Sequence, residues 1–555
     1  MRLLLSLEFG FLALQAMRNV TLFALIAGIV VCRNLNEVFA APCEEGKHAR
    51  FIGAARLLLL ALLGLATFAI PTGMVHRWLR SPWQFGLSES PLAFSHEATR
   101  FAGKDGLPDR ALAYDLRMAS LYVYHNGPAK KVYIDPRLEL PSLEDFKTYV
   151  AIENSLETSG NDWQAKLEQI DARLILLDHD QHHMSEATLL SSQQWRLVYF
   201  DALAAVLVPR KSSVSETDYP AVNFAARHFH GTREPSVPGV PGAALHEART
   251  LVNLGANVRK DRALTWPWRI PMLLHALDRL DLAEQQGAGL DDSLTLRGQC
   301  HWLLAPDLSV RPPSPGEGWN ATKALSWAQS TWQLRQALAE NPQYAPALKS
   351  LYDSWRARSM PDAQLVVGRQ LRELSAFGGQ QQAELIRLER QVASLISASG
   401  IAHKASERAV DFLTSRHCAA TAAEFVMHQH VELRTWDWQR LDRLAAAWMH
   451  VGEPAQAREL WNAASQAGFE AERLARLADS YLVERQFERA ENLYGQALER
   501  DPRLVAARWA LAMLHIQRGD ATSAHRACQA ALDCDPPPEL QATLAAFKAM
   551  LERCR

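Results

Sequence analysis

Three apolar stretches stand at the start of the chain: Leu3–Met17, Asn19–Cys32 and Phe51–Val75. The third contains an uncharged run from Leu57 to Met74, which is close to the length that a helix needs to cross about 30 Å of hydrocarbon. Glu8 and Arg18 interrupt the first two stretches, so we interpret them as two short spans that meet at a turn. The pattern predicts a transmembrane region of two to three spans over residues 1–80.

A cleaved signal peptide is the alternative interpretation of this region, because Arg2 begins a basic stretch and Val38–Ala41 ends in small residues. That site lies well past the apolar run, however, and Phe51–Val75 would still anchor the chain. The Lys and Arg residues near the ends of the spans favour a cytoplasmic loop between the second and third spans. We therefore expect an integral protein of the cell membrane, with an extracytoplasmic soluble part after about residue 76.

Residues 87–215 change to short β-rich runs between helical stretches. The apolar runs Leu174–Leu177 and Ala204–Val208 predict buried strands, and the two-residue link Ala202-Leu203 predicts a hairpin. Two segments with helical spacing precede these strands: Glu144–Leu156 and Asp162–Ile170. This region is therefore predicted to be a small extracytoplasmic α/β domain.

The strongest pattern lies near the C-terminus, where identical residues recur at a fixed distance. Four pairs are each 34 positions apart: Ala478 and Ala512, Ala490 and Ala524, Ala497 and Ala531, Pro502 and Pro536. This period resembles that of the tetratricopeptide (TPR) repeat, in which small residues let the two helices of each repeat approach closely. A four-helix bundle would not be expected to show a fixed period. The resemblance is strong over residues 437–538 and weaker over residues 325–360.

The predicted fold class is mainly α, with N-terminal transmembrane helices, a small α/β domain and an α-solenoid of degenerate and clear TPR repeats. Two Pro/Gly-rich loops interrupt the helical part: Pro235–Gly242 and Arg311–Gly318. The predicted regions are residues 1–80 (transmembrane), 87–215 (α/β), 216–436 (helical, with degenerate TPR-like hairpins) and 437–555 (TPR repeats with a C-terminal capping helix).

Residues 1–215 carry a second resemblance. Apolar spans followed by "VYIDPRLELPSLEDFKTY" and "WRLVYFDALAAVLVPR" look like the C-terminal end of bacterial membrane proteins related to the GT-C glycosyltransferases. In that family an extracytoplasmic domain follows the last span; Ile134, Asp135 and Arg137 match the end of one of its strands, and Pro136 stands where Gly is usual. The resemblance implies no catalytic residue here, because the family's acidic catalytic residue lies upstream of anything in this chain. For Asp135 and Arg137 we favour a structural role over contact with a sugar or phosphate.

Composition reduces the number of function classes that the chain is expected to fit. Lys and Arg total 59 against 61 Asp and Glu, a net charge of −2, so bulk electrostatics gives no reason to expect nucleic-acid binding. The seven cysteines are scattered and form no CxxC pair, a pattern that indicates neither a disulfide framework nor a zinc ribbon.

One segment, "LLDHDQHHMSE" (Leu176–Glu186), gathers several residues able to bind a metal or to carry chemistry. It begins at the end of a predicted strand and precedes a helix that we expect to start at Ser185, so His179, His182 and His183 would lie in a loop. A zinc site needs ligands held by rigid elements, and no HExxH motif is present. We favour a solvated loop over adventitious metal binding or a metal-dependent hydrolase site, and we expect no catalytic residue, no cofactor and no bound metal.

The candidate binding residues come from the first helix of each of the last two repeats. In TPR proteins these helices line the concave face, and the matching positions here form a largely apolar groove with one carboxylate: Ala475, Asp479, Leu482, Val483, Trp509, Met513, Ile516 and Gln517. Such a groove suits a peptide or a helix, although each of these side chains is equally suited to packing on its neighbours.

Together these patterns predict a membrane-anchored, non-enzymatic scaffold for protein–protein interactions. It would bind a protein or peptide partner through the concave face of its repeats, contact the lipid bilayer and bind no nucleic acid. The alternative is a truncated or split component of a GT-C-like system for lipid-linked sugar transfer.

Overall fold

A computed structural model describes residues 92–134, 142–160, 162–192, 194–231, 242–258, 262–308, 317–376, 378–429, 432–433, 436–464 and 469–553. The chain divides into two compact units, Met1–Ala93 and Phe94–Arg555, and every element named below belongs to the second. Among the described residues, no helix combines the length and the hydropathy needed to cross a bilayer. The predicted spans of residues 1–80, and also Asp135 and Arg137, lie outside the described residues.

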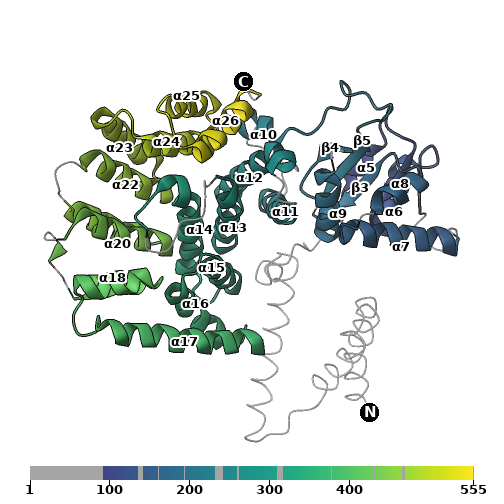
Figure 1. The fold of residues 1–555 in the computed structure, drawn as a ribbon. Coiled ribbons are helices and arrows are strands. Elements are labelled where there is room, and N and C mark those ends of the chain that lie inside the picture. The colour runs from purple at the N-terminus through teal and green to yellow at the C-terminus, as the bar shows by residue number, and fades with distance from the viewer. Residues whose placement is uncertain are drawn as a thin grey trace, which may run out of the picture. The chain divides into compact units, whose positions relative to one another are not determined.

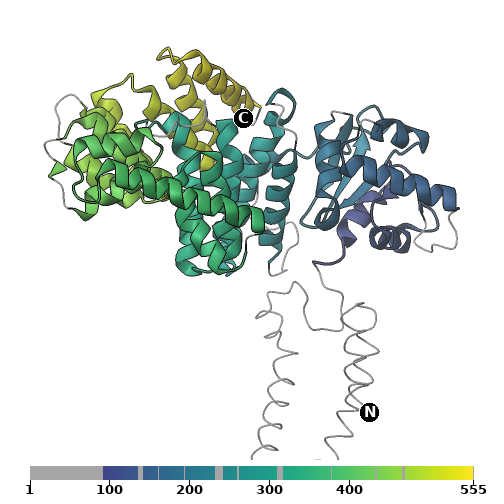
Figure 2. The same cartoon turned by 60° about the horizontal axis from the view of Figure 1, so that its bottom comes forward.

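The first part of this unit is an α/β domain (Figure 1). Its elements are α5 (His96–Ala102), β1 (Arg110–Ala113), α6 (Leu116–Asn126), β2 (Lys131–Val132), α7 (Leu143–Glu157), α8 (Trp163–Gln169), β3 (Ile175–Asp178), α9 (His179–Ser191), β4 (Trp195–Phe200) and β5 (Ala204–Pro209). The strand order is β2-β1-β3-β5-β4. β1 is parallel to β2 and β3, whereas β5 is antiparallel to β3 and β4. Two groups of helices pack around the sheet, α5 with α6 and α9 with α7 and α8 (Figure 2).

The strands and helices predicted for this domain are confirmed. Leu174–Leu177 and Ala204–Val208 are fully buried, as expected of strands covered on both faces. β4 and β5 form the predicted hairpin, and Asp201 closes its turn because its carboxylate accepts hydrogen bonds from the backbone N–H groups of Leu203 and Ala204, at 2.7 and 2.9 Å.

The histidine-rich segment differs from the predicted solvated loop. Its residues form the start of α9, which begins at His179 instead of Ser185 and departs from helical geometry at His182 (φ −125°, ψ 24°). His179 is buried, with Nδ1 2.7 Å from Glu186 Oε2 and Nε2 3.1 Å from the Asp201 carbonyl oxygen. Burial opposes a charge on His179, but the Glu186 carboxylate outweighs it and raises the pKa of His179 to about 9. The predicted solvated loop was wrong, because partners inside the domain satisfy the polar atoms of His179 and so allow this segment to be buried.

All the elements described after the sheet are helices. They are α10 (Phe224–His230), α11 (Ala243–Asn257), α12 (Arg262–Gln285), α13 (Leu290–Leu308), α14 (Ala321–Glu340), α15 (Ala345–Ala357), α16 (Pro361–Glu373), α17 (Gly379–Ser399), α18 (Glu407–Ser415), α19 (Ala419–His428), α20 (Trp438–Val451), α21 (Pro454–Ala463), α22 (Glu470–Val483), α23 (Phe487–Arg500), α24 (Val505–Gln517), α25 (Ala521–Leu532) and α26 (Pro538–Glu552). The chain is therefore mainly α, as predicted.

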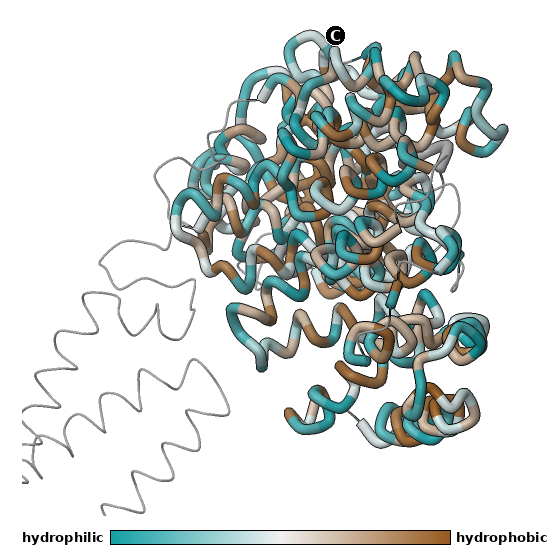
Figure 3. Tube along the Cα trace, turned by 90° about the vertical axis from the view of Figure 1, so that its left-hand side faces the viewer, coloured by the Kyte–Doolittle hydropathy of each residue, from teal (hydrophilic) through white to brown (hydrophobic). Residues whose placement is uncertain are grey.

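Three successive helical hairpins, α20–α21, α22–α23 and α24–α25, form the C-terminal array, and α26 packs against the last of them. Ala478 on α22 and Ala490 on α23 are both completely buried, and so are their counterparts one period later, Ala512 and Ala524. The absence of larger side chains at these positions lets the two helices of each hairpin pack closely. Figure 3 shows hydrophobic and hydrophilic residues interspersed along the chain of this unit. In the array, α23 buries Ala490, Tyr494 and Ala497 on one face and exposes Glu488, Asn492 and Glu499 on the other.

Candidate interaction surface

The eight predicted groove residues lie on the first helices of the last two hairpins, as the period predicts. Ala475, Asp479, Leu482 and Val483 are on α22, and the other four are on α24. All of these side chains are buried except Gln517, which is half-buried. The inner face of the array is therefore not an open groove at these positions.

Helix α14 of the same chain covers this inner face. It packs along α20, α22 and α24, the first helices of all three hairpins, and its other side packs on α13. Figures 1 and 2 show α14 between these two groups of helices. Thirteen residues of α14 are buried, and they fall all around its circumference, which is the pattern of a core helix and not of a surface helix.

Trp319, just before α14, is held by two carboxylates of the array. Its indole N–H donates to Asp479 Oδ2 at 2.7 Å, and its backbone N–H donates to Asp442 Oδ2 at 3.0 Å. Asp479 also accepts a hydrogen bond from the Tyr494 hydroxyl at 2.6 Å, and Asp442 accepts one from the Trp461 indole at 2.9 Å. Burial raises the pKa of Asp479 to about 6.

A close backbone approach accompanies this contact. A Cβ atom on Gly318 would lie 2.5 Å from Asp442 Oδ2, so a larger residue here would displace that carboxylate from its hydrogen bonds. Further along α14, the side-chain amides of Gln329 and Gln517 hydrogen-bond each other reciprocally, at 3.0 and 3.1 Å.

These contacts explain why the open groove was wrongly predicted. A face rich in small apolar side chains, with a buried carboxylate, is more stable when another helix covers it and supplies hydrogen-bond donors.

Beside the last two turns of α14 lies a cleft of about 500 Å³. Apolar side chains from α14, α15, α16 and α20 line it, among them Leu338, Trp355, Val366 and Trp448. Val366 is 59% exposed. An ion pair between Arg335 and Glu453 and the carboxylate of Glu424 add charge to its lining. We call this site the α14–α20 cleft. Sequence analysis missed it, because its walls come from two separate stretches of the chain, one with α14, α15 and α16 and the other with α19 and α20.

These hairpins define the C-terminal part as a helical-hairpin repeat solenoid. Its period is that of one family in particular, and residues 475–537 match the family model described as tetratricopeptide repeat. No curated protein matches this chain. One solved structure that aligns with it is titled "Crystal structure of APC/C hetero-tetramer Cut9-Hcn1", at 12% sequence identity, over 99% of this chain and 94% of that chain, with a TM-score of 0.21. None of these comparisons supports the resemblance of residues 1–215 to GT-C glycosyltransferases, which stays a prediction.

Proposed function

We propose that this protein is a membrane-anchored scaffold that binds a protein partner through its helical repeats. The observation that carries the proposal is the repeat array itself, with its 34-residue period and its match to the tetratricopeptide model over residues 475–537. Stacked hairpins of this kind present extended surfaces on which a helix or a peptide can lie.

The α14–α20 cleft is the proposed docking site. α14 already covers the faces of α22 and α24, so a partner that follows the inner surface meets the cleft where α14 ends. Val366 offers exposed apolar surface at its edge, and the buried tryptophan Trp355 lies among its lining residues. A peptide that inserts an apolar side chain there would gain a binding free energy of about 25 cal/mol for each Å² of apolar surface that it buries.

The test compares two exposed aliphatic residues on neighbouring helices. Val366→Asp puts a charge in the cleft, whereas Ile386→Asp puts the same charge on α17, where Ile386 is 43% exposed and does not line the cleft. We expect proteins that co-purify with the full chain to be lost from Val366→Asp and retained by Ile386→Asp. A photo-crosslinking amino acid at position 366 should then capture the same partner, and one at position 386 should not. Equal recovery by both variants would contradict docking in the cleft.

The membrane anchor and the extracytoplasmic placement are parts of this proposal that rest on the apolar stretches before residue 76 and on the distribution of Lys and Arg around them. We expect the full chain to stay in the membrane pellet after extraction at alkaline pH. A C-terminal tag should be digested by protease added outside intact spheroplasts. A tag that is digested only after lysis would place the repeats in the cytoplasm and leave the scaffold proposal standing.

A further inference from the structure

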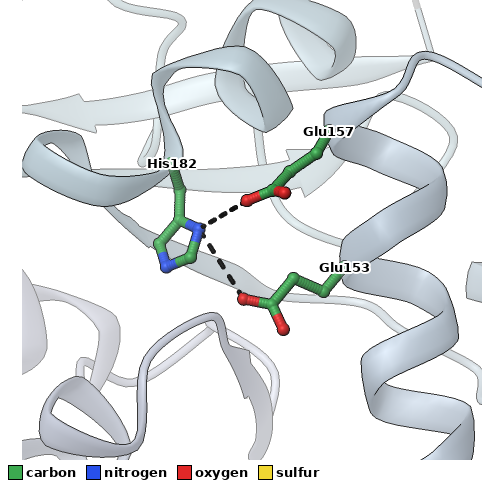
Figure 4. A group of neighbouring side chains, drawn as sticks. All are labelled: Glu153, Glu157 and His182. Atoms are coloured by element: carbon green, nitrogen blue, oxygen red, sulfur yellow. Dashed lines mark ion pairs between the residues drawn. The ribbon is translucent and has the colours of Figure 1, made fainter.

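The start of α9 faces two carboxylates of α7. Glu153 and Glu157 are four residues apart, one turn of helix, so they project from the same face of α7. The His182 Nδ1 atom lies 3.6 Å from Glu157 Oε1 and 3.9 Å from Glu153 Oε1. Figure 4 shows both carboxylates directed at this one ring nitrogen. The three ligand atoms all lie within 4.8 Å of one another.

The ring of His182 is aimed into this site without a hydrogen bond. Its side chain is only 6% exposed, and Nδ1 makes no hydrogen bond to any described residue. The Tyr114 ring packs edge-on against it, with ring centroids 5.0 Å apart. A buried polar atom that lacks a partner costs about 1–3 kcal/mol, so such atoms point to a missing ligand.

Among the residues that the structure describes, no Lys or Arg forms an ion pair with Glu153 or Glu157. Glu153 and Glu157 both make their ion-pair contact with the same His182 nitrogen. Arg117 does not supply the missing charge, because its guanidinium binds Asp115 at 3.1 Å and Asp178 at 2.8 Å. Two like charges four residues apart on one helix destabilise it unless a cation lies between them.

We propose that Glu153, Glu157 and His182 bind one divalent transition-metal ion, and that Zn²⁺ suits this set of donors best. Zinc binds imidazole nitrogen and carboxylate oxygen at about 2.0–2.2 Å, so two ligands of a tetrahedral ion lie about 3.4 Å apart. The separations of 3.6 and 3.9 Å are slightly wider. Small rotations of the two glutamates, which are 27% and 41% exposed, would close them, and the same exposure gives the ion a way in. Three protein ligands leave a fourth position for water.

The place of the site in the fold agrees with this proposal. β3 ends at Asp178, and α9 follows it directly, so His182 lies at the carboxyl edge of the parallel strands β1 and β3. Ligands of open α/β sheets bind at this edge. The sequence-based expectation of no metal rested on the cysteine pattern and on the histidines of Leu176–Glu186, and two of the three ligands, Glu153 and Glu157, lie outside that segment.

Metal binding is tested with the full chain in detergent, after a chelator has removed bound ions, by calorimetric titration with Zn²⁺ alone. We expect wild-type protein to bind one Zn²⁺ per chain at a saturable site that weakens by about 100-fold or more in Glu157→Gln and in His182→Ala. Glu144→Gln is the matched control, because Glu144 is an exposed glutamate at the other end of α7, and it should bind as wild type does.

Two further measurements keep the test decisive. Co²⁺ should give a visible absorption band with wild-type protein and with Glu144→Gln that is absent from Glu157→Gln. If His182→Ala fails to fold, the partly exposed Glu153→Gln and Glu157→Gln variants decide the question. Binding that is equally strong in every variant would mean an adventitious ion only, and would overturn the proposal, as would the absence of any saturable binding by wild-type protein.

Discussion

Two of the clusters of buried polar groups among the described residues are completed in different ways. Where α14 meets the repeats, Asp479 and Asp442 each accept hydrogen bonds from a tryptophan indole and from a second donor. At the carboxyl edge of the sheet, His182 faces two carboxylates with no hydrogen bond to Nδ1. A buried carboxylate that accepts hydrogen bonds from its own chain contributes to the stability of the fold. A group of metal-ligating atoms without a cation is suited instead to binding an ion from outside.

The largest effect is expected where Trp319 is removed. Trp319→Ala deletes a fully buried indole and leaves Asp479 without one of its two donors, so we expect a loss of about 3–5 kcal/mol in unfolding free energy. Urea unfolding of the full chain measures it, and hydrogen exchange should rise in both α14 and α22. Trp319→Phe keeps most of the volume and loses only the indole hydrogen bond, so its cost should be clearly smaller. Equal losses in the two variants would mean that Asp479 does not hold α14.

A smaller effect, which depends on pH, is expected at Asp479. Because burial raises its pKa to about 6, the folded protein holds this proton more tightly than the unfolded chain does. The stability from this group is therefore complete below about pH 4 and is lost as the pH rises through about 6. Asp479→Asn cannot ionise, so its stability relative to wild type should rise by roughly 2–3 kcal/mol between pH 4 and pH 7. Thermal melts of both proteins across this range measure the difference, and parallel curves would contradict the shifted pKa.

The smallest effect is expected at the cluster on the sheet edge. Glu157→Gln removes one of two like charges and no hydrogen bond on which His182 depends, so in metal-free buffer its stability should stay within about 0.5 kcal/mol of wild type. Added Zn²⁺ should raise the melting temperature of wild type and leave that of Glu157→Gln unchanged. A large loss of stability in metal-free Glu157→Gln would show that this cluster, like the one at Trp319, is completed by the chain itself.

The repeats could be predicted because their information is local. Ala478 and Ala490 lie twelve residues apart in one hairpin, and the same spacing recurs one period later at Ala512 and Ala524. Each hairpin buries its own small residues, so a fixed spacing in the sequence maps directly onto contacts in space. The runs of β3 and β5 could be predicted for the same reason, since a continuous apolar run is typical of a strand covered on both faces.

The cover on the inner face could not be predicted, because it depends on a contact across 160 residues between Trp319 and Asp479. The weaker TPR resemblance of residues 325–360 does not indicate that α14 would cover the repeats, and most residues of α14 are small or polar, as in "ATKALSWAQS". The zinc ligands were missed for a related reason. Glu153 and Glu157 show only the ordinary spacing of an exposed helix face, and nothing in the sequence indicates that α9 would bring His182 against it.

The position of α14 in the chain has a consequence for how the protein is made. A ribosome completes Trp319 and the helix behind it long before Asp479, which is 160 residues further on. α14 therefore waits with its small-residue surface uncovered until the hairpins that enclose it have been synthesised. A transcript that ends before α20 would release a chain in which the side of α14 that faces the repeats stays uncovered, and such a chain should be a preferred substrate for chaperones and proteases.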